Sequence, residues 1–171
     1  MARSSPPDEL DRLVTQHLPW ALRFATRLTG TPDAAEDVLQ EALVRVARSW
    51  KSFRKEAEFR TWLFRIVINV FRDRLARKQL PNGPLPDDPA DPRSADPARE
   101  AQTSELGELI AVRVSALPPR QREVMVLTAF EGLSPKETAE LLGMTQANVH
   151  SALAVARDRL RRELAPYFAE R

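Results

Sequence analysis

The fold is decided by one stretch of sequence, SPKETAELLGMTQANVHSALAVARDRLRREL, at residues 134–164. Ser134 followed three residues later by Glu137 is the pattern of a capping box, in which the two side chains satisfy the first turn of a helix. Gly143 can take the left-handed backbone conformation that ends a helix, and Thr145 can cap the helix that follows. The stretch therefore predicts two helices joined by a tight turn.

The spacing within this stretch is typical of one supersecondary unit. Two helices that cross steeply need a small residue where they touch, a glycine in the turn and an apolar anchor in the second helix. Ala139, Gly143 and Val149 supply these at offsets of 0, 4 and 10 residues. This is the spacing of DNA-binding helix-turn-helix units. A purely structural helical hairpin is the alternative, and the two helix caps favour DNA binding.

The beginning of the second helix is expected to face the bases of DNA. The candidates for this role are Thr145, Gln146, Asn148, His150 and Ser151. Glutamine and asparagine amides can pair with adenine edges in the major groove. Further along the helix, the candidates for phosphate contacts are Arg157 and Arg159, with Arg161 and Arg162 beyond them. For these arginines, the alternative is a solvated helix end that the helix dipole stabilises.

Composition and charge narrow the class of protein. The 171 residues hold no cysteine, which excludes disulfides and thiolate chemistry. Gly-rich phosphate loops and metalloprotease or serine-hydrolase motifs are absent as well, so we predict no catalytic residue, no metal site and no cofactor. No signal peptide and no apolar run of membrane-spanning length is present, which predicts a cytoplasmic protein.

A Pro/Asp-rich segment divides the chain. Residues 80–103 contain six prolines and four aspartates and show neither a helical nor a strand period. We interpret residues 80–104 as an acidic linker. Because Ala, Leu, Glu and Arg dominate the remainder, the fold class is predicted to be all-α. It consists of two small helical domains, residues 8–79 and 105–165.

The N-terminal domain shows three helical segments. Apolar residues recur at helical spacing from Leu10 to Leu28, and Pro19 is expected to kink this run or divide it into two helices. A second helix is predicted to end near Trp50, and a third to begin near Phe59. The third is expected to bury Phe59, Trp62, Leu63, Ile66, Val67 and Val70.

Charge is unevenly distributed along the chain. Residues 51–80 hold nine Lys and Arg against three acids, a net charge of +6, whereas residues 81–110 have a net charge of −5. A polyanion would bind the first segment and avoid the second. Arg65, Asn69 and Arg72 share one face of the third helix. A solvated helix face is the alternative interpretation of the basic segment.

Two segments together resemble a known family. Residues 117–164, LPPRQREVMVLTAF followed by the helix-turn-helix, look like region 4 of sigma-70 proteins, which reads the upstream (−35) promoter element. Residues 33–78, DAAEDVLQEALVRVARSW and the basic segment, look like region 2, which binds core RNA polymerase and melts the −10 element. Their order and the missing middle domain resemble the extracytoplasmic-function (ECF) group. The resemblance covers residues 8–78 and 105–165.

The resemblance implies roles for individual residues. It places Asp37, Leu39, Gln40, Glu41 and Leu43 on the helix that docks on core RNA polymerase. It implies that promoter DNA of the −10 element, including a flipped base, is held by Lys51, Phe53, Arg54, Lys55, Arg60, Arg65, Asn69, Arg72 and Arg74. Trp62 we assign to the core. The resemblance also implies an anti-sigma factor as partner and a linker that threads the polymerase cleft.

One departure from the family concerns the reading helix. Ala152 and Val155 stand where family members usually carry arginine or lysine, and His150 stands where lysine is common. Losing those cations is expected to weaken phosphate or guanine contacts. We hypothesise that the apolar surface there touches thymine methyl groups or a partner protein.

Three other functions were weighed against that of a sigma factor. A helix-turn-helix regulator outside polymerase would need a receiver or ligand-binding domain, and residues 8–79 show no βα alternation. An inactive sigma-like interaction protein would fit the missing cations of the reading helix. An enzyme would need a catalytic constellation, and no motif supplies one.

Overall fold

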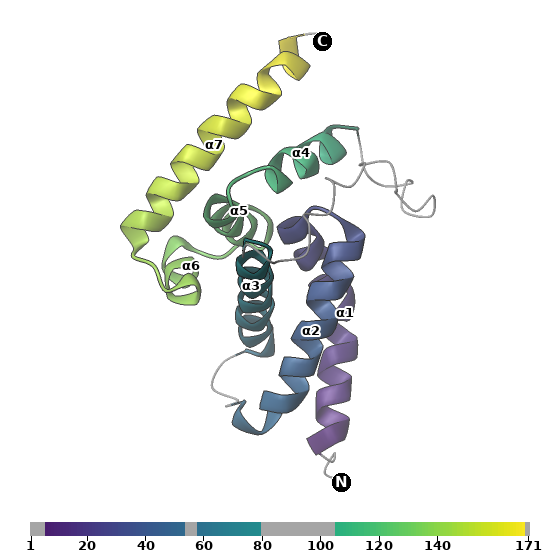
Figure 1. Cartoon of the computed structure of the whole chain (residues 1–171). Helices are drawn as coiled ribbons and strands as arrows, with labels where there is room; N and C mark the ends of the chain where they lie inside the picture. Colours follow the sequence, from purple (N-terminus) through teal and green to yellow (C-terminus); the bar gives the residue numbers. More distant parts are fainter. Residues whose placement is uncertain (1–5, 54–57, 80–104, 170–171) are drawn as a thin grey trace. The chain divides into compact units, whose positions relative to one another are not determined.

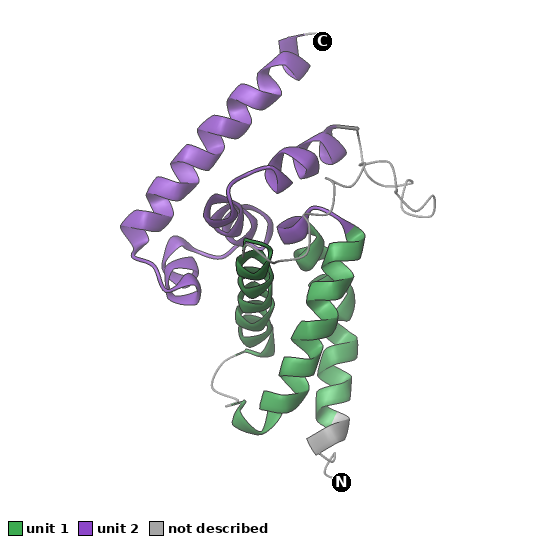
Figure 2. Cartoon of the chain, in the orientation of Figure 1, with its two compact units in different colours: residues 1–26, 32–84 green, residues 27–31, 85–171 purple. Residues whose placement is uncertain are grey.

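The computed structural model describes residues 6–53, 58–79 and 105–169, and all regular structure in these ranges is helical (Figure 1). The chain forms two compact units (Figure 2). Unit 1 comprises residues 1–26 and 32–84, and unit 2 comprises residues 27–31 and 85–171. The prediction of an all-α chain with two helical domains is thus confirmed. The predicted linker, as well as Arg54 and Lys55, lies outside the described residues.

Unit 1 is built from helices α1 (Pro6–Thr29), α2 (Pro32–Ser49) and α3 (Phe59–Lys78), with a short 3-10 helix η1 (Trp50–Ser52) after α2. The end of α1, from Arg27 on, is assigned to unit 2. Helix α1 passes through Pro19 without ending, so the predicted division into two helices is wrong. Aromatic packing beside the proline supports the continuous helix. The rings of Trp20 and Phe24 each lie 4.7 Å from that of Phe64, measured between centroids.

The core of unit 1 is formed by α1, α2 and α3, and α1 contributes Ala21, Phe24 and Ala25. Helix α2 contributes Ala35, Val38, Leu39, Ala42 and Val46, and α3 contributes Phe59, Leu63, Phe64, Val67, Ile68, Val70 and Phe71. The two alanines are fully buried and let the helix backbones approach closely. Trp62 and Ile66, predicted as core, are only half-buried. The row formed by Phe64, Ile68 and Phe71 takes the inward position instead, at spacings of four and three residues.

Unit 2 contains α4 (Glu105–Ser115), α5 (Pro119–Met125), α6 (Pro135–Leu142) and α7 (Gln146–Ala169). Helix α5 continues as a π-helical turn, η3 (Val126–Phe130). The core of unit 2 contains side chains from all of these elements: Val114, Leu117, Val124, Met125, Val126, Leu127, Ala139, Leu141, Leu142, Val149, Leu153 and Ala156.

The predicted caps of the helix-turn-helix are present. Ser134 Oγ accepts from the Glu137 backbone N–H at 3.2 Å, and Glu137 Oε2 accepts from the Ser134 N–H at 2.8 Å. Hydrogen bonds from the side chain and backbone of Ser134 lower the pKa of Glu137. Thr145 Oγ1 accepts from the Asn148 N–H at 3.1 Å and caps α7. Gly143 ends α6 with φ 64° and ψ 42°.

Replacing Gly143 should destabilise the turn through the backbone alone. An added Cβ meets no atom within 4 Å, so the cost of Gly143→Ala is that of a left-handed conformation, about 1–2 kcal/mol. Gly143→Asn should cost less. Amide hydrogen exchange in α6 and α7 measures this loss of protection. Ser151→Ala, at an exposed position of α7, is the control. Unchanged protection in Gly143→Ala would show that the turn does not depend on the left-handed residue.

Candidate nucleic-acid interface

The turn holds α7 with one face inward and the predicted reading positions outward. Val149 is fully buried and anchors the helix against the rest of unit 2. All five candidates, Thr145, Gln146, Asn148, His150 and Ser151, have exposed side chains. The geometry therefore presents to solvent the residues that the sequence predicted would face DNA.

The arginines of α7 are not equivalent. Arg159 Nε lies 3.0 Å from Glu163 Oε1, and Arg162 is paired with Asp158. Arg157 and Arg161 are exposed, and the described part of the chain offers them no ion pair. Of the arginines predicted to contact phosphates, Arg159 and Arg162 are thus held by acids of the same helix.

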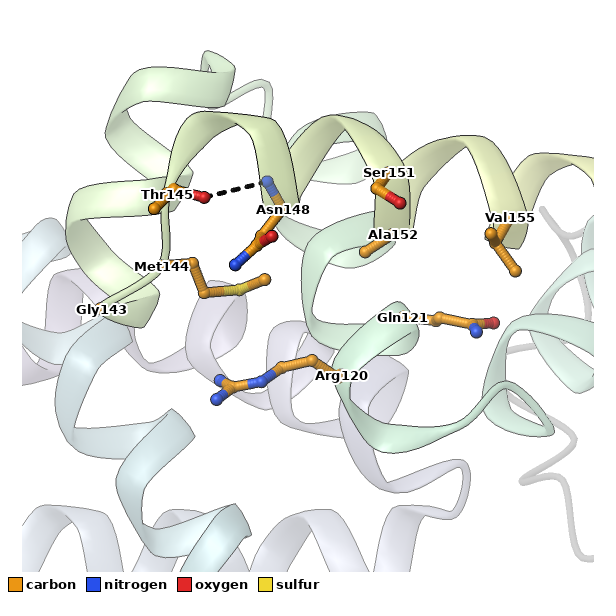
Figure 3. Close-up of a pocket in the computed structure, with 9 residues that line it drawn as sticks. All are labelled: Arg120, Gln121, Gly143, Met144, Thr145, Asn148, Ser151, Ala152 and Val155. Atoms are coloured by element: carbon orange, nitrogen blue, oxygen red, sulfur yellow. Dashed lines mark hydrogen bonds between the residues drawn. The ribbon is translucent and has the colours of Figure 1, made fainter.

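A groove runs between the start of α5 and α7, with a volume of about 780 Å³. Figure 3 shows Arg120 and Gln121 on the α5 side, facing Asn148, Ala152 and Val155 of α7. On the α7 side, Asn148 lies toward the beginning of the helix, and Ala152 and Val155 follow along it (Figure 3). The sequence analysis did not find the α5 side of this groove, because no periodicity connects residues 120 and 155.

A network of ion pairs joins α2 to α3 in unit 1. Arg45 Nη2 lies 2.6 Å from Glu41 Oε1 and 2.8 Å from Asp73 Oδ2. Arg77 Nη2 lies 2.9 Å from Glu41 Oε1. Burial acts to raise the pKa of Glu41, but hydrogen bonds from Arg45 and Arg77 outweigh it and the pKa is lowered. Hydrogen bonds to Asp73 and Glu41 raise the pKa of Arg45.

The same network includes Arg74, to which the family resemblance gives a role in binding −10 DNA. Arg74 Nη2 lies 2.7 Å from Asp37 Oδ2, and Arg74 Nη1 lies 3.8 Å from Glu41 Oε2. Asp37 and Glu41 are acids of the predicted polymerase-docking helix. Arg74 therefore lies beside the docking helix and partly neutralises its acids.

The outward surface of α2 differs from the predicted docking set at one position. Leu39 is only 6% exposed, so it packs in the core and does not face a partner. Leu43 is half-buried, whereas Gln40 is exposed as expected. Val44, which the sequence analysis did not select, is 49% exposed and follows Gln40 by one helical turn. Gln40 and Val44 thus form the centre of the outward face.

The predicted −10 residues divide into inward and outward groups. The Arg60 guanidinium stacks over Trp20 at 4.6 Å and over Phe64 at 5.5 Å, so it serves the packing of α1 on α3. Arg65 and Asn69 are exposed one turn apart on α3. Arg72, on the same face, is half-buried, and Lys51 on η1 is exposed.

An aromatic cluster stands where η1 approaches the start of α3. The Trp50 and Phe53 rings are stacked with centroids 5.3 Å apart, and the Trp62 ring lies 4.7 Å from Phe53. All three side chains are half-buried, so part of each ring reaches the surface. This cluster explains why Trp62 is not a core residue. The signal for it in the sequence was the aromatic spacing around residues 54–57, which lie outside the described residues.

In the described ranges, no group of three or more His, Asp or Glu side chains is arranged to hold a metal ion. No described helix combines the length and the apolar character needed to cross a membrane.

Comparison with known proteins places both units in one family. The family model described as Sigma-70 region 2 matches residues 13–80, and that described as Sigma-70, region 4 matches residues 108–160. The chain is 36% identical over 157 residues to the ECF RNA polymerase sigma factor SigM of Mycobacterium tuberculosis, covering 90% of this chain and 76% of SigM. The chain belongs to the ECF RNA polymerase sigma factors. Sigma factors of this family are non-enzymatic transcription initiation factors.

Other relatives agree with this assignment. The sigma factor is 36% identical over 163 residues to ECF RNA polymerase sigma factor SigE of Mycolicibacterium smegmatis, which covers 94% of this chain and spans 63% of that relative's length. Among solved structures it resembles CnrH, in a complex with the cytosolic domain of CnrY (TM-score 0.63, 29% identity, 92% of this chain and 88% of CnrH). It shares the fold of Bartonella quintana RpoE, solved with the anti-sigma factor NepR (TM-score 0.75, 24% identity, 92% and 97%).

Membership in the family favours transcription initiation over the two alternatives from the sequence, a regulator outside polymerase and a sigma-like interaction protein. Both family regions are present in the expected order, and each corresponds to a compact helical unit of the sigma factor.

The Asp37–Arg74 pair should be energetically coupled. In a double-mutant cycle of Asp37→Ala and Arg74→Ala, we expect a coupling of about 0.2–1 kcal/mol, because the pair is partly exposed. All three tryptophans lie in unit 1, so their fluorescence during urea unfolding reports on this unit. Asp37→Ala combined with Arg48→Ala, three turns further along α2, is the matched control and should show no coupling. Equal coupling energies in the two cycles would show that Asp37 and Arg74 do not form the ion pair of this network.

Proposed function

We propose that this chain directs promoter-specific initiation by binding core RNA polymerase with α2, the −10 strand with α3 and η1, and the −35 duplex with α7. The observation that carries the proposal is the separation of charge on unit 1. Acids and arginines pair with one another along the α2–α3 edge. Arg65 and Asn69 are exposed on α3, outside this network of ion pairs. One small unit thus offers a near-neutral docking edge and a separate basic face.

The docking edge suits a helix of the polymerase. Gln40 and Val44 occupy the centre of the outward face of α2, and Asp37 and Glu41 lie beside them. An apolar residue flanked by polar groups at helical spacing is the pattern that packs against a partner helix. Arg74 and Arg77 hold the two carboxylates in place, so we assign them as positioning residues for docking.

The outward face of α3 suits a single DNA strand. Arg65 can neutralise a phosphate, and Asn69, one turn later, can donate to the backbone or to a base edge. The half-buried rings of Trp50, Phe53 and Trp62 offer a surface on which an unstacked base can rest. Strand opening at the −10 element is therefore assigned to η1 and α3.

In unit 2, the exposed beginning of α7 reads the upstream duplex, with Arg157 and Arg161 on phosphates. The proposal includes action in the cytoplasm, on the nucleoid with polymerase, and no catalysis by the chain itself. It also includes regulation by an anti-sigma factor, because the solved relatives CnrH and RpoE are held by CnrY and NepR.

Arg65 and Arg74 are assigned to different partners, and substituting each in turn tests the proposal. The full chain mixed with purified core polymerase should start transcripts at discrete sites on genomic fragments, whereas core alone should not. Arg65→Ala should leave core affinity unchanged and reduce the salt dependence of promoter binding by about one unit of slope, since one phosphate contact is lost. Arg74→Ala should weaken core binding by roughly 2- to 5-fold, the worth of a surface ion pair, and leave that slope unchanged.

Arg12→Ala, at an exposed position of α1, is the control for both measurements. If no discrete start sites appear with the full chain, the proposed function is wrong. If the two variants exchange their effects, the function holds but the assignment of the two faces is reversed.

A further inference from the structure

The groove between α5 and α7 combines three kinds of chemistry that converge in Figure 3. On the α7 side, Asn148 supplies an amide, and Ala152 and Val155 supply methyl groups. On the α5 side, Arg120 supplies a cation. Val155 is 52% exposed. A single exposed valine is common on protein surfaces. Here it lies on the same flank of α7 as an exposed asparagine, seven residues earlier.

This combination matches the major-groove edge of A·T base pairs. Adenine presents an acceptor and a donor that an asparagine amide can pair with at once, and thymine presents a methyl group that prefers an apolar contact. Guanine presents two acceptors, which arginine or lysine usually binds. The flank formed by Asn148, Ala152 and Val155 carries no cation, so it lacks the group that would select guanine.

We propose that this flank reads A·T pairs in the upstream promoter element, with Asn148 pairing to an adenine and Val155, beside Ala152, contacting the methyl group of a thymine. The inference rests on the proposed function and names the base pairs that its reading helix selects. At Val155, an apolar contact takes the place of the cation contact that the family pattern would supply.

Helix geometry sets the distance between the two contacts. Asn148 and Val155 are seven residues apart, which corresponds to about 10 Å along an α-helix. Base pairs are stacked about 3.4 Å apart, so a helix lying along the groove would place the two contacts about three steps apart. A tilted helix would shorten this to about two. The adenine and the thymine should therefore lie two to three base pairs apart.

The α5 wall of the groove supplies a phosphate contact and an unsatisfied polar atom. Arg120 is exposed, and its Nη1 lies 3.5 Å from Glu123 Oε2, too long for a strong hydrogen bond. This ion pair to Glu123 engages one nitrogen, and the remaining N–H groups of the exposed guanidinium can contact a phosphate. The Gln121 side-chain oxygen is buried and has no hydrogen-bond partner among the described residues.

The experiment removes single methyl groups from the DNA. Upstream duplexes are selected from a random pool with the full chain bound to core polymerase, and each thymine of the selected element is replaced in turn by deoxyuridine. At one thymine, we expect this replacement to weaken binding about fourfold, the worth of one methyl group leaving water. Val155→Ala should weaken binding to the thymine duplex to a similar extent. The complex of this variant with core polymerase should be insensitive to deoxyuridine at that position.

A second variant tests the polar end of the groove. Asn148→Ala should lose about tenfold or more in discrimination for adenine, two or three base pairs from the sensitive thymine. Val112→Ala, the same substitution at a position 40% exposed on α4, is the matched control and should remain sensitive to deoxyuridine.

The inference is overturned if no thymine is sensitive, or if wild type and Val155→Ala lose the same affinity with deoxyuridine. It is also overturned if the selected element has no A·T pairs at the predicted spacing, in which case the groove serves a protein partner or another ligand. In each of these cases, start sites would still appear, so the proposed function would stand. If no element is selected and no start sites appear, both fail.

Discussion

The close packing of α2 on α3 fixes the rotation of both helices, and with it the surface on which each charged side chain of unit 1 lies. Fully buried Ala35 and Ala42 allow the close approach. Once the two helices are set, acids from α2 and arginines from α3 meet along one edge and cancel. Arg65 and Asn69 are left on a different face. Residues 51–80 carry a net charge of +6. Ion pairs with α2 cancel part of this charge, and the exposed Arg65 remains on the face that we propose binds a nucleic-acid strand.

In unit 2, packing likewise fixes the rotation of one helix, α7. The left-handed turn at Gly143 and the buried anchor Val149 determine the rotation of α7. Their combination exposes the reading positions and places Val155 on the groove toward α5 (Figure 3). Paired acids on the helix hold Arg159 and Arg162. In the proposed reading of DNA, methyl contacts therefore take over part of the role that cations have in the family pattern.

Features that depend on neighbouring residues in the chain could be predicted from the sequence. The capping box at Ser134, the turn at Gly143 and the presence of two helical domains are of this kind. The roles of Leu39, Arg60 and Arg74 could not be predicted, because each depends on the rotation of a helix against a partner distant in sequence. Helical periodicity allowed Leu39 on either side of the core boundary, and it contained no sign that Arg60 would stack on Trp20. The partners of Arg74 lie more than thirty residues away.

Photocrosslinking from three exposed positions tests the central claim that packing assigns one face to each partner. A photoreactive residue is placed at Val44 on α2, Arg65 on α3 and Val155 on α7 in the full chain, and each variant is assembled with core polymerase on promoter DNA. We expect crosslinks from Val44 to core polymerase, from Arg65 to promoter DNA near the −10 element, and from Val155 to the upstream duplex. Crosslinks from Val44 to DNA, or from Arg65 to core polymerase, would contradict this assignment of faces.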